Sequence, residues 1–354
     1  MLIAIDTGLT TTKVATLSPD GITVAAFAST VVRGLVGEQG AGVYCTGRSQ
    51  AAFQFYSVLS QECGLFPLSA RGFRDPTSAR RRVLVEHAMS VAKATGKTAI
   101  VFTQPVANYY RDGIDHHEAI EHDERTMMKM PVTTVDALSG RTVRATWTIK
   151  ELAVSPESVW SIYDLAINDP STARDDLAAF DHPQLGADAV IAIADFGATG
   201  TRVNFIEWSG DPVPTLLASR SREVSIGGAH VADELERRLI EAHGYRDVID
   251  LVAMRSDPTV MIAGKRVDIS AEIEASEKAV FEKLRVAEFE GLAAEVERGD
   301  VQAIMLVGGA SHLFGAMAKE LFPADRLLET PDPIYSPVRG LLKSRAALKN
   351  GGGR

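Results

Sequence analysis

Residues 5–14 read Ile-Asp-Thr-Gly-Leu-Thr-Thr-Thr-Lys-Val, and residues 194–203 read Ala-Asp-Phe-Gly-Ala-Thr-Gly-Thr-Arg-Val. Both segments contain the pattern Asp-x-Gly-x-Thr-x-Thr-(Lys/Arg)-Val, and each links two apolar runs that are typical of strands. Since each residue type makes up roughly 5–8% of an ordinary chain, a second copy by chance is improbable. Two unrelated β-turns are the alternative, because Asp and Gly both favour turns. The repeat predicts one hairpin of the same kind in each half of the chain.

The residue types in these hairpins suit the binding of phosphate. Gly8 and Gly197 would let backbone N–H groups approach an anion without a side chain in the way. The threonine hydroxyls add donors, and Lys13 adds a positive charge. Asp6 and Asp195 would repel phosphate, so their presence indicates a hydrated Mg²⁺ between the carboxylates and a nucleotide. We therefore expect the two hairpins to hold phosphates from opposite sides of a cleft.

A third segment, residues 304–311, reads Ile-Met-Leu-Val-Gly-Gly-Ala-Ser, the pattern of a strand, a double glycine and a helix start. Gly308 and Gly309 would allow a ribose or another flat ligand to approach the backbone near a helix N-terminus. A strand-to-helix turn that needs glycine only for packing explains the segment equally well.

Composition is that of an ordinary globular protein. The 354 residues are 45% hydrophobic and 23% charged, with a net charge of −9. These values exclude a disordered chain and a disulfide scaffold, and the acidic balance argues against a dedicated nucleic-acid surface. Cys45 and Cys63 lack zinc-site spacing, which favours a reducing, cytoplasmic location. No apolar run is long enough to predict a transmembrane helix.

Hydrophobic periodicity and turn residues predict two α/β domains with mixed sheets. Strands are expected at residues 2–5, 14–17, 22–32, 98–103, 190–194, 203–208, 214–218 and 301–307. Helices are expected at residues 83–95, 114–130, 229–243, 271–298, 311–321 and 336–349, with a frayed tail behind the last. Residues 34–50 are expected to be a loop because they are rich in glycine, and residues 132–135 and 143–149 to form a hairpin around Ser139-Gly140. Pro170, Pro183 and Gly186 place the domain boundary within residues 170–187.

The two hairpin segments and the double-glycine segment, in this order along nearly the whole chain, resemble the two phosphate loops and the adenosine motif of the actin, sugar-kinase and heat-shock-chaperone ATPase superfamily. Within it, the likeness is closest to the ParM/StbA-type plasmid-segregation actins. Val-Ser-Pro-Glu-Ser at residues 154–158 resembles their V-x-P-E-S segment, and Ser-Ile-Gly-Gly at residues 225–228 resembles the loop after their second phosphate hairpin. Pro331-Asp332-Pro333, followed by Val-Arg-Gly-Leu at residues 338–341, resembles their C-terminal pattern.

The resemblance implies an α/β, actin-like (ribonuclease H-like) two-domain fold with a nucleotide cleft between the domains. Residues 1–183 would form domain I, with residues 333–354 packing back onto it, and residues 184–332 would form domain II. It further implies ATP, possibly GTP, with Mg²⁺ as cofactors, and head-to-tail filaments that depend on the nucleotide. The implied partners are further copies of the chain and an adaptor protein bound to centromere-like DNA, with no direct contact to nucleic acid or membrane.

The resemblance also assigns roles to residues. Asp6 and Asp195 would hold Mg²⁺ through water, and Glu157, with Asp195, would be catalytic by orienting or activating the attacking water. A carboxylate in the first turn of a helix, favoured by the helix dipole, explains Glu157 as well. The phosphates would be bound by Gly8, Thr10, Thr11, Thr12, Lys13, Gly197, Ala198 and Thr199. The nucleoside would be lined by Gly227, Gly228, Gly308, Gly309 and Ala310.

Two other clusters have simpler interpretations. The basic residues Arg71, Arg74, Arg80, Arg81 and Arg82 are expected to be solvated, or else to contact an acidic partner or the next subunit. Glu118 and His122, four residues apart, are expected on a solvated polar face, since the metalloprotease pattern is missing.

Two further functions stay open at this point: a small-molecule kinase of the same superfamily, and a non-polymerising scaffold that binds ATP as a structural ligand.

Overall fold

The computed structural model describes residues 1–8, 10–33, 40–46, 54–59, 79–111, 114–136, 139, 141–143, 145–169, 172, 176–177, 180, 185, 188–208, 214–247 and 249–351. The chain divides into two compact units. The first unit comprises residues 1–176 and 335–354, and the second comprises residues 177–334. The division falls inside the predicted boundary segment, although Pro170, Pro183 and Gly186 themselves lie outside the described residues.

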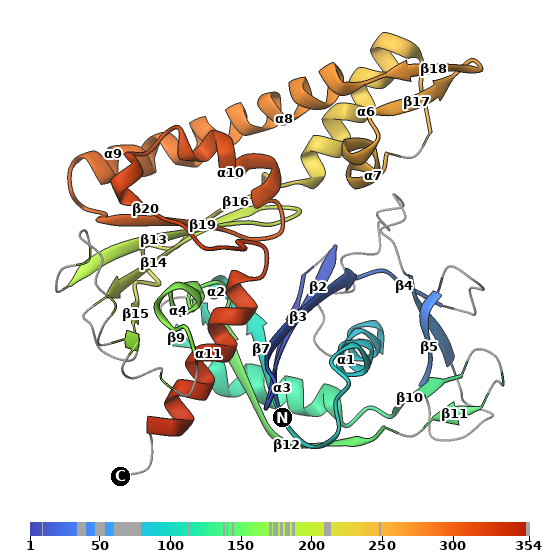
Figure 1. Cartoon of the computed structure of the whole chain (residues 1–354), viewed down its shortest axis with the longest axis vertical. Helices are drawn as coiled ribbons and strands as arrows, with labels where there is room; N and C mark the ends of the chain where they lie inside the picture. Colours follow the sequence, from blue (N-terminus) through green and yellow to red (C-terminus); the bar gives the residue numbers. More distant parts are fainter. Residues whose placement is uncertain are drawn as a thin grey trace. The chain divides into compact units, whose positions relative to one another are not determined.

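The central sheet of the first unit has the strand order β12-β7-β1-β2-β3 (Figure 1). β1 (Leu2–Thr7) and β2 (Thr11–Ser18) form the first predicted hairpin, and β3 (Gly21–Ala28) continues the antiparallel arrangement. β7 (Gly96–Gln104) runs parallel to β1, and β12 (Trp147–Pro156) runs parallel to β7. The carboxyl ends of three parallel strands therefore meet at one edge of this sheet.

Side chains that alternate along the strands build a different layer on each face of this sheet. On one face, Ile3 and Ile5 pack with residues of α1 (Ala79–Val91) and α3 (His117–Met128). On the other, Ala4 packs with residues of α11 (Ser336–Gly351), which also contacts α4 (Ser161–Ala166).

Gly340 explains why the C-terminal pattern contains a glycine. A Cβ there would lie 2.1 Å from the backbone oxygen of Trp160, so only glycine permits this approach of α11. Arg339 next to it makes two hydrogen bonds of 2.6 Å with the carboxylate of Asp164 in α4.

A second sheet in the first unit, of order β11-β10-β5-β6-β4, corrects two expectations. Its strands are β4 (Val31–Arg33), β5 (Gly40–Thr46), β6 (Gln54–Leu59), β10 (Val132–Val135) and β11 (Thr142–Val143). The loop prediction was wrong at residues 40–46: a Cβ on Gly42 would come within 2.8 Å of the Tyr44 hydroxyl, so this glycine gives room to a packed ring. The predicted hairpin is present, since β10 pairs antiparallel with β11, but its second strand was predicted too long: β11 ends at Val143, and Trp147 begins β12 in the other sheet. Short elements α2 (Val106–Tyr109), β8 (Tyr110–Arg111) and β9 (Ile114–Asp115) precede α3.

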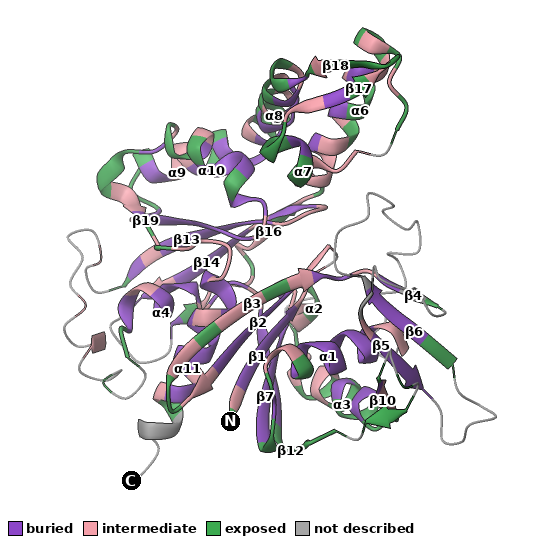
Figure 2. Cartoon of the chain, turned by 45° about the vertical axis from the view of Figure 1, so that its right-hand side comes forward, coloured by how far each residue is buried: buried purple, intermediate pink, exposed green. Residues whose placement is uncertain are grey.

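The sheet of the second unit repeats the topology of the first. β13 (Ala189–Phe196) and β14 (Thr201–Trp208) form the second predicted hairpin. β19 (Ala303–Val307) runs parallel to β13, and β20 (Leu327–Leu328) runs parallel to β19. β15 (Thr215–Leu216) and β16 (Arg222–Val224) both pair with β14. Figure 2 shows β13 and β19 in the colour of buried residues, as expected for central strands.

The helices of the second unit largely follow the sequence pattern. They are α6 (Ala229–His243), α7 (Leu251–Ser256), α8 (Ser270–Leu284), α9 (Glu290–Glu297) and α10 (Ser311–Lys319). The long helix expected at residues 271–298 is interrupted by a π-helical turn, Arg285–Phe289. The hairpin of β17 (Thr259–Ile262) and β18 (Lys265–Asp268) and the 3₁₀ turn Ala324–Arg326 were not predicted. Within the described residues, no helix is both long and apolar enough to cross a membrane.

Candidate functional site

The turn of the first hairpin is tight, and hydrogen bonds from Ser29 stabilise it. A Cβ on Gly8 would lie 2.6 Å from the backbone oxygen of Thr11, so the turn requires glycine. Ser29 donates from its backbone N–H to the oxygen of Thr10 (2.7 Å) and from its hydroxyl to the oxygen of Gly8 (2.6 Å). Its hydroxyl also bonds the hydroxyl of Thr12 (2.8 Å), which is fully buried. Thr12, expected to bind phosphate, therefore uses its hydroxyl to fix the turn.

Asp6 lies opposite Lys13 in the ladder of the first hairpin, and their side chains meet. The Lys13 ammonium lies 3.3 Å from Oδ2 of Asp6, and the Thr103 hydroxyl donates to Oδ1 (2.9 Å). Asp6 is only 5% exposed, so this carboxylate is held by a cation and a hydroxyl at the carboxyl ends of β1 and β7. No sequence pattern marked Thr103, which comes from the neighbouring parallel strand β7.

The turn of the second hairpin closes in the same way. The backbone N–H of Gly197 donates to the oxygen of Gly200 (2.9 Å), and a Cβ on Gly197 would lie 2.7 Å from that oxygen. Thr201, at the position that corresponds to Thr12, is fully buried and donates its hydroxyl to the oxygen of Ile226 (2.8 Å). In each hairpin, the threonine before the basic residue therefore bonds a neighbouring segment: Thr12 bonds Ser29, and Thr201 bonds the backbone of Ile226.

The second hairpin and the loop at residues 225–228 are joined backbone to backbone. Gly228 donates its N–H to the oxygen of Gly197 (3.0 Å), and Ala229 donates to that of Ala198 (2.7 Å). A Cβ on Gly227 would lie 2.5 Å and 2.6 Å from these same oxygens. The structure thus brings together Gly197, Ala198, Gly227 and Gly228, and it shows why position 227 requires glycine.

The double-glycine segment meets the carboxylate of the second hairpin. Gly308 has φ of +100°, and a Cβ there would lie 2.1 Å from Oδ1 of Asp195. Ala310 donates its N–H to the oxygen of Phe196 (2.8 Å), and Gly308 donates to that of Pro333 (2.9 Å). Glycine at position 308 is therefore needed to leave room for the 8%-exposed side chain of Asp195.

Glu157 follows β12 at the edge of the first unit's sheet where β1 and β7 also end. Its backbone N–H donates to the oxygen of Gln104 (2.7 Å), the last residue of β7. Ser158, directly after it, has φ of +57°, a left-handed conformation that costs a residue with a Cβ about 1–2 kcal/mol. Strain of this kind persists where the surrounding structure imposes it and is common at functional sites.

The basic cluster corrects another expectation. Arg81 and Arg82 are 4% and 5% exposed rather than solvated, because the start of α1 is packed within the first unit. Arg81 pairs with Glu124 and Arg82 pairs with Glu86. Arg71 and Arg74 lie outside the described residues, whereas Arg80 is half-buried. Glu118 and His122 of α3 are exposed.

The residues present fit a nucleotide with a hydrated cation. The two turns carry no side chain at Gly8 and Gly197, and each unit supplies one buried carboxylate, Asp6 in the first and Asp195 in the second. Among the described residues, no group of three or more Asp, Glu, His or Cys side chains forms a metal cage. This donor set suits Mg²⁺, which keeps several waters and needs only one or two carboxylates beside substrate phosphates.

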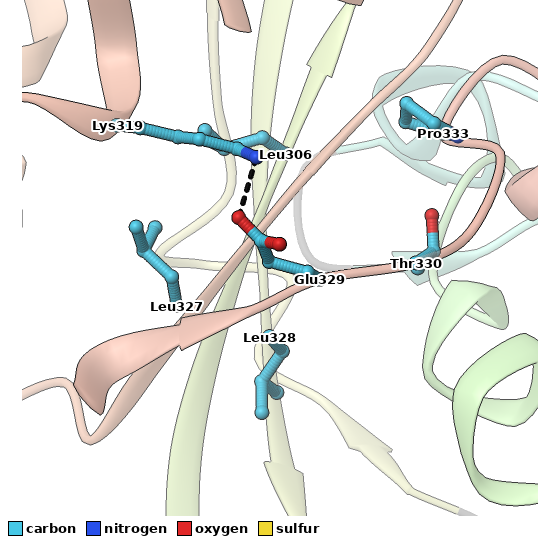
Figure 3. A pocket seen from close by; sticks show the side chains of 7 residues that line it. All are labelled: Leu306, Lys319, Leu327, Leu328, Glu329, Thr330 and Pro333. Atoms are coloured by element: carbon cyan, nitrogen blue, oxygen red, sulfur yellow. Dashed lines mark ion pairs between the residues drawn. The ribbon is translucent and has the colours of Figure 1, made fainter. Parts of the chain in front are cut away.

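A small hollow in the second unit is a separate feature. Leu306, Leu327, Leu328, Thr330 and Pro333 line it together with the ion pair of Lys319 and Glu329 (Figure 3). None of the predicted site residues is among its lining residues, so the hollow carries no part of the nucleotide hypothesis.

Comparison with known proteins rests on structure. No protein-family model matches the chain, and no curated protein sequence matches it. Among solved structures, a 15-stranded ParM filament from Clostridium botulinum has a TM-score of 0.70 at 14% identity, covering 97% of both chains. An archaeal actin homologue in complex with ADP has a TM-score of 0.69 at 16% identity, covering 99% of this chain and 100% of its own. Bacillus thuringiensis ParM with AMPPNP has a TM-score of 0.64 at 14% identity, covering 96% and 97%. The chain has an actin-like α/β fold of the ParM type, which confirms the predicted fold class.

Proposed function

We propose that this chain is a ParM-like actin homologue that binds and hydrolyses ATP and polymerises into nucleotide-dependent filaments that segregate plasmid or other DNA. The repeated hairpin is the main support for this proposal. Each unit contains a glycine turn, a buried carboxylate and the same arrangement of strands. Residues 1–183 with 333–354, and residues 184–332, would act as the two actin-like domains that bind one nucleotide.

The binding roles follow from the geometry within each unit. Backbone N–H groups of the two turns would donate to phosphate oxygens, and Lys13 would add charge. Gly227 and Gly308 pack closely against the backbone of the second hairpin, so residues 227–228 and 308–309 would line the nucleoside next to that hairpin. Asp6 and Asp195 would hold Mg²⁺ through water. The cation, when bound, neutralises charge on the phosphate oxygens.

Glu157 would orient the attacking water and accept its proton. It stands at the edge where β1, β7 and β12 end, in the same unit as Asp6 and Lys13, and a strained residue follows it. Positioned proton transfer of this kind contributes typically about 10²–10⁴-fold to a rate.

Filament formation is the second half of the proposal. A ParM filament and other ParM structures are among the folds most similar to this one. Head-to-tail association of unlike surfaces gives an open polymer, so one chain type is sufficient. The net charge of −9 favours an adaptor protein, rather than this chain, as the part that contacts DNA.

Light scattering after addition of ATP and Mg²⁺ tests the whole proposal. A rise followed by a decay, with release of phosphate, is the expected result, and the same experiment with GTP determines the preferred nucleotide. Consumption of ATP only when a sugar is added, without scattering, would instead indicate a kinase. ATP binding with neither scattering nor turnover would indicate a scaffold.

The Glu157→Ala variant tests the catalytic role. We expect at least a 100-fold lower turnover with ATP binding retained, because the side chain acts on water rather than on the nucleotide. Glu118→Ala, at an exposed position of α3 in the same unit, is the matched control and should leave turnover unchanged. Equal turnover in the two variants would remove Glu157 from the mechanism.

A further inference from the structure

A continuous set of hydrogen bonds links the first hairpin to the backbone of Glu157, and all of its members lie in the first unit. It begins at Thr7, the last residue of β1, whose hydroxyl accepts from Nε of Arg81 (3.3 Å). Arg81 lies at the start of α1, 4% exposed, with its guanidinium 5.6 Å from the ring centre of Phe102. A charged group this deeply buried needs a partner.

Glu124 of α3 is that partner. Its carboxylate oxygen Oε1 lies 2.5 Å from Nη1 of Arg81, and the side chain is completely buried. Burial raises the pKa of Glu124, and Arg81 opposes that rise. The same Oε1 accepts from the side-chain amide of Gln104 (2.7 Å), while Oε2 has no hydrogen-bond partner within the described structure. One oxygen thus ties α1, α3 and the end of β7 together.

Gln104 carries the connection to the catalytic segment. Its side chain donates to Glu124, and its backbone oxygen accepts from the N–H of Glu157 (2.7 Å). Gln104 lies opposite Pro156 in the ladder of β7 and β12, directly before Glu157. Fixing the side chain of Gln104 therefore restricts the backbone to which Glu157 is bonded.

We infer that Gln104 and the buried pair Arg81–Glu124 are positioning residues that set Glu157 relative to the first phosphate hairpin. The inference rests on the proposed function, since it assigns a task to the surroundings of the proposed catalytic carboxylate. None of these side chains needs to touch the nucleotide. Their effect on the reaction is through geometry, and displacement of a reacting group by about 1 Å can cost about 100-fold in rate.

A simpler interpretation is that the network only stabilises the fold. Removing one member of a buried ion pair is strongly destabilising, so Arg81 and Glu124 cannot by themselves separate the two interpretations. Gln104 can, because removal of its amide leaves the ion pair and every backbone hydrogen bond in place.

The test is Gln104→Met, which keeps the length of the side chain and removes its donor. We expect turnover of ATP to fall between about 10-fold and 100-fold, nucleotide affinity to stay within about twofold, and deuterium to enter the backbone around Glu157 faster. Tyr44→Phe is the matched control: it also removes one buried hydrogen bond, from Tyr44 to His87, but in the other sheet of the unit. The control should leave turnover and exchange around Glu157 unchanged.

Rescue by a conservative change provides a second, independent measurement. Glu124→Gln keeps an oxygen that can accept from Arg81 and Gln104, so turnover should stay near that of the wild type. Glu124→Leu removes the acceptor and also leaves Arg81 without its counter-charge, so it should lose at least as much turnover as Gln104→Met and unfold at lower urea. If the wild type hydrolyses ATP and Gln104→Met matches it in turnover and exchange, the inference is wrong while the proposed function stands. If the wild type does not hydrolyse ATP, the proposed function itself fails.

Discussion

The two hairpins share one sequence pattern and one strand arrangement, yet the ion pairs of their basic residues differ in exposure. Asp6 faces Lys13 across the first ladder and pairs with it, and both are less than a tenth exposed. Asp195 faces Arg202 in the second ladder, and Arg202 pairs with Glu223 of β16; the side chains of Arg202 and Glu223 are 20% and 37% exposed. The pattern therefore determines the backbone of the turn, while neighbouring strands determine the electrostatics.

The segments that support the two turns differ as well. Ser29 supports the first turn with a side chain that bonds both Thr12 and Gly8. A backbone oxygen, that of Ile226, supports the second through Thr201. The second turn is thus held by the loop that also carries Gly227 and Gly228, so its support and the proposed nucleoside surface are one segment.

Replacement of the two basic residues, Lys13 and Arg202, should give the largest difference in free energy of unfolding between the two hairpins. Lys13→Met leaves the buried carboxylate of Asp6 without its cation, and such changes cost about 3–5 kcal/mol. Arg202→Met removes the more exposed pair with Glu223, a kind of pair worth about 1 kcal/mol or less, and should cost less than Lys13→Met. Urea unfolding without nucleotide measures both free energies.

Lys97→Met, an exposed lysine at the start of β7, controls for the change of residue type and should be nearly neutral. The double variant Asp6→Asn with Lys13→Met should recover part of the loss, because no unpaired buried charge is left. Equal costs for Lys13→Met and Arg202→Met would show that the two hairpins are electrostatically alike after all.

Replacement of the two buried threonines, Thr12 and Thr201, tests how much each hydroxyl bond contributes to stability. Thr12→Val should cost about 1 kcal/mol, since Ser29 still donates to Gly8. Thr201→Val should cost at least as much, about 1–2 kcal/mol, because the oxygen of Ile226 loses its side-chain donor. Thermal unfolding measures both, with the exposed Thr148→Val of β12 as control. A larger cost at Thr12 than at Thr201 would mean that the hydroxyl pair, not the shared loop, is the stronger support.

Sequence patterns predicted those parts of the molecule that depend on local geometry. The alternation around Asp6 and Asp195, the glycines of the turns and the regular helix Ala229–His243 are local, and the structure contains all of them. Ser29 and Thr103 are common residues that matter only because of the strands they approach, so no local signal marked them.

Burial misled the interpretation in two places. Arg81 looked like a solvated charge because its partner Glu124 stands more than forty residues away in an otherwise polar helix. Residues 40–46 looked like a loop because glycine marks turns, whereas Gly42 makes room for the ring of Tyr44. Both errors come from tertiary contacts that outweigh local propensity.

The two units should also differ in their response to acid, although by less. In the first unit, His87 of α1 packs edge-on against Phe27 of β3 and bonds the Tyr44 hydroxyl (2.6 Å). Burial lowers the pKa of His87 to about 4. In the second unit, burial raises the pKa of Glu288, whose carboxylate bonds Arg222 of β16 (2.8 Å).

These shifts have opposite consequences as pH falls. A histidine with a lowered pKa gives stability that is complete above pH 6.5 and is lost toward pH 4, because the unfolded chain takes up the proton first. A carboxyl with a raised pKa takes up its proton first in the folded state, so acid removes no stability through Glu288.

Between pH 7 and pH 5.5 we expect the first unit to lose about 1 kcal/mol of folding free energy through His87. Hydrogen exchange at both pH values, corrected for the intrinsic rate, should show faster opening of α1 and β5 but not of β14. His87→Phe should lower stability at pH 7 and abolish this acid-dependent loss; a loss of the same size in that variant would assign the effect to another group.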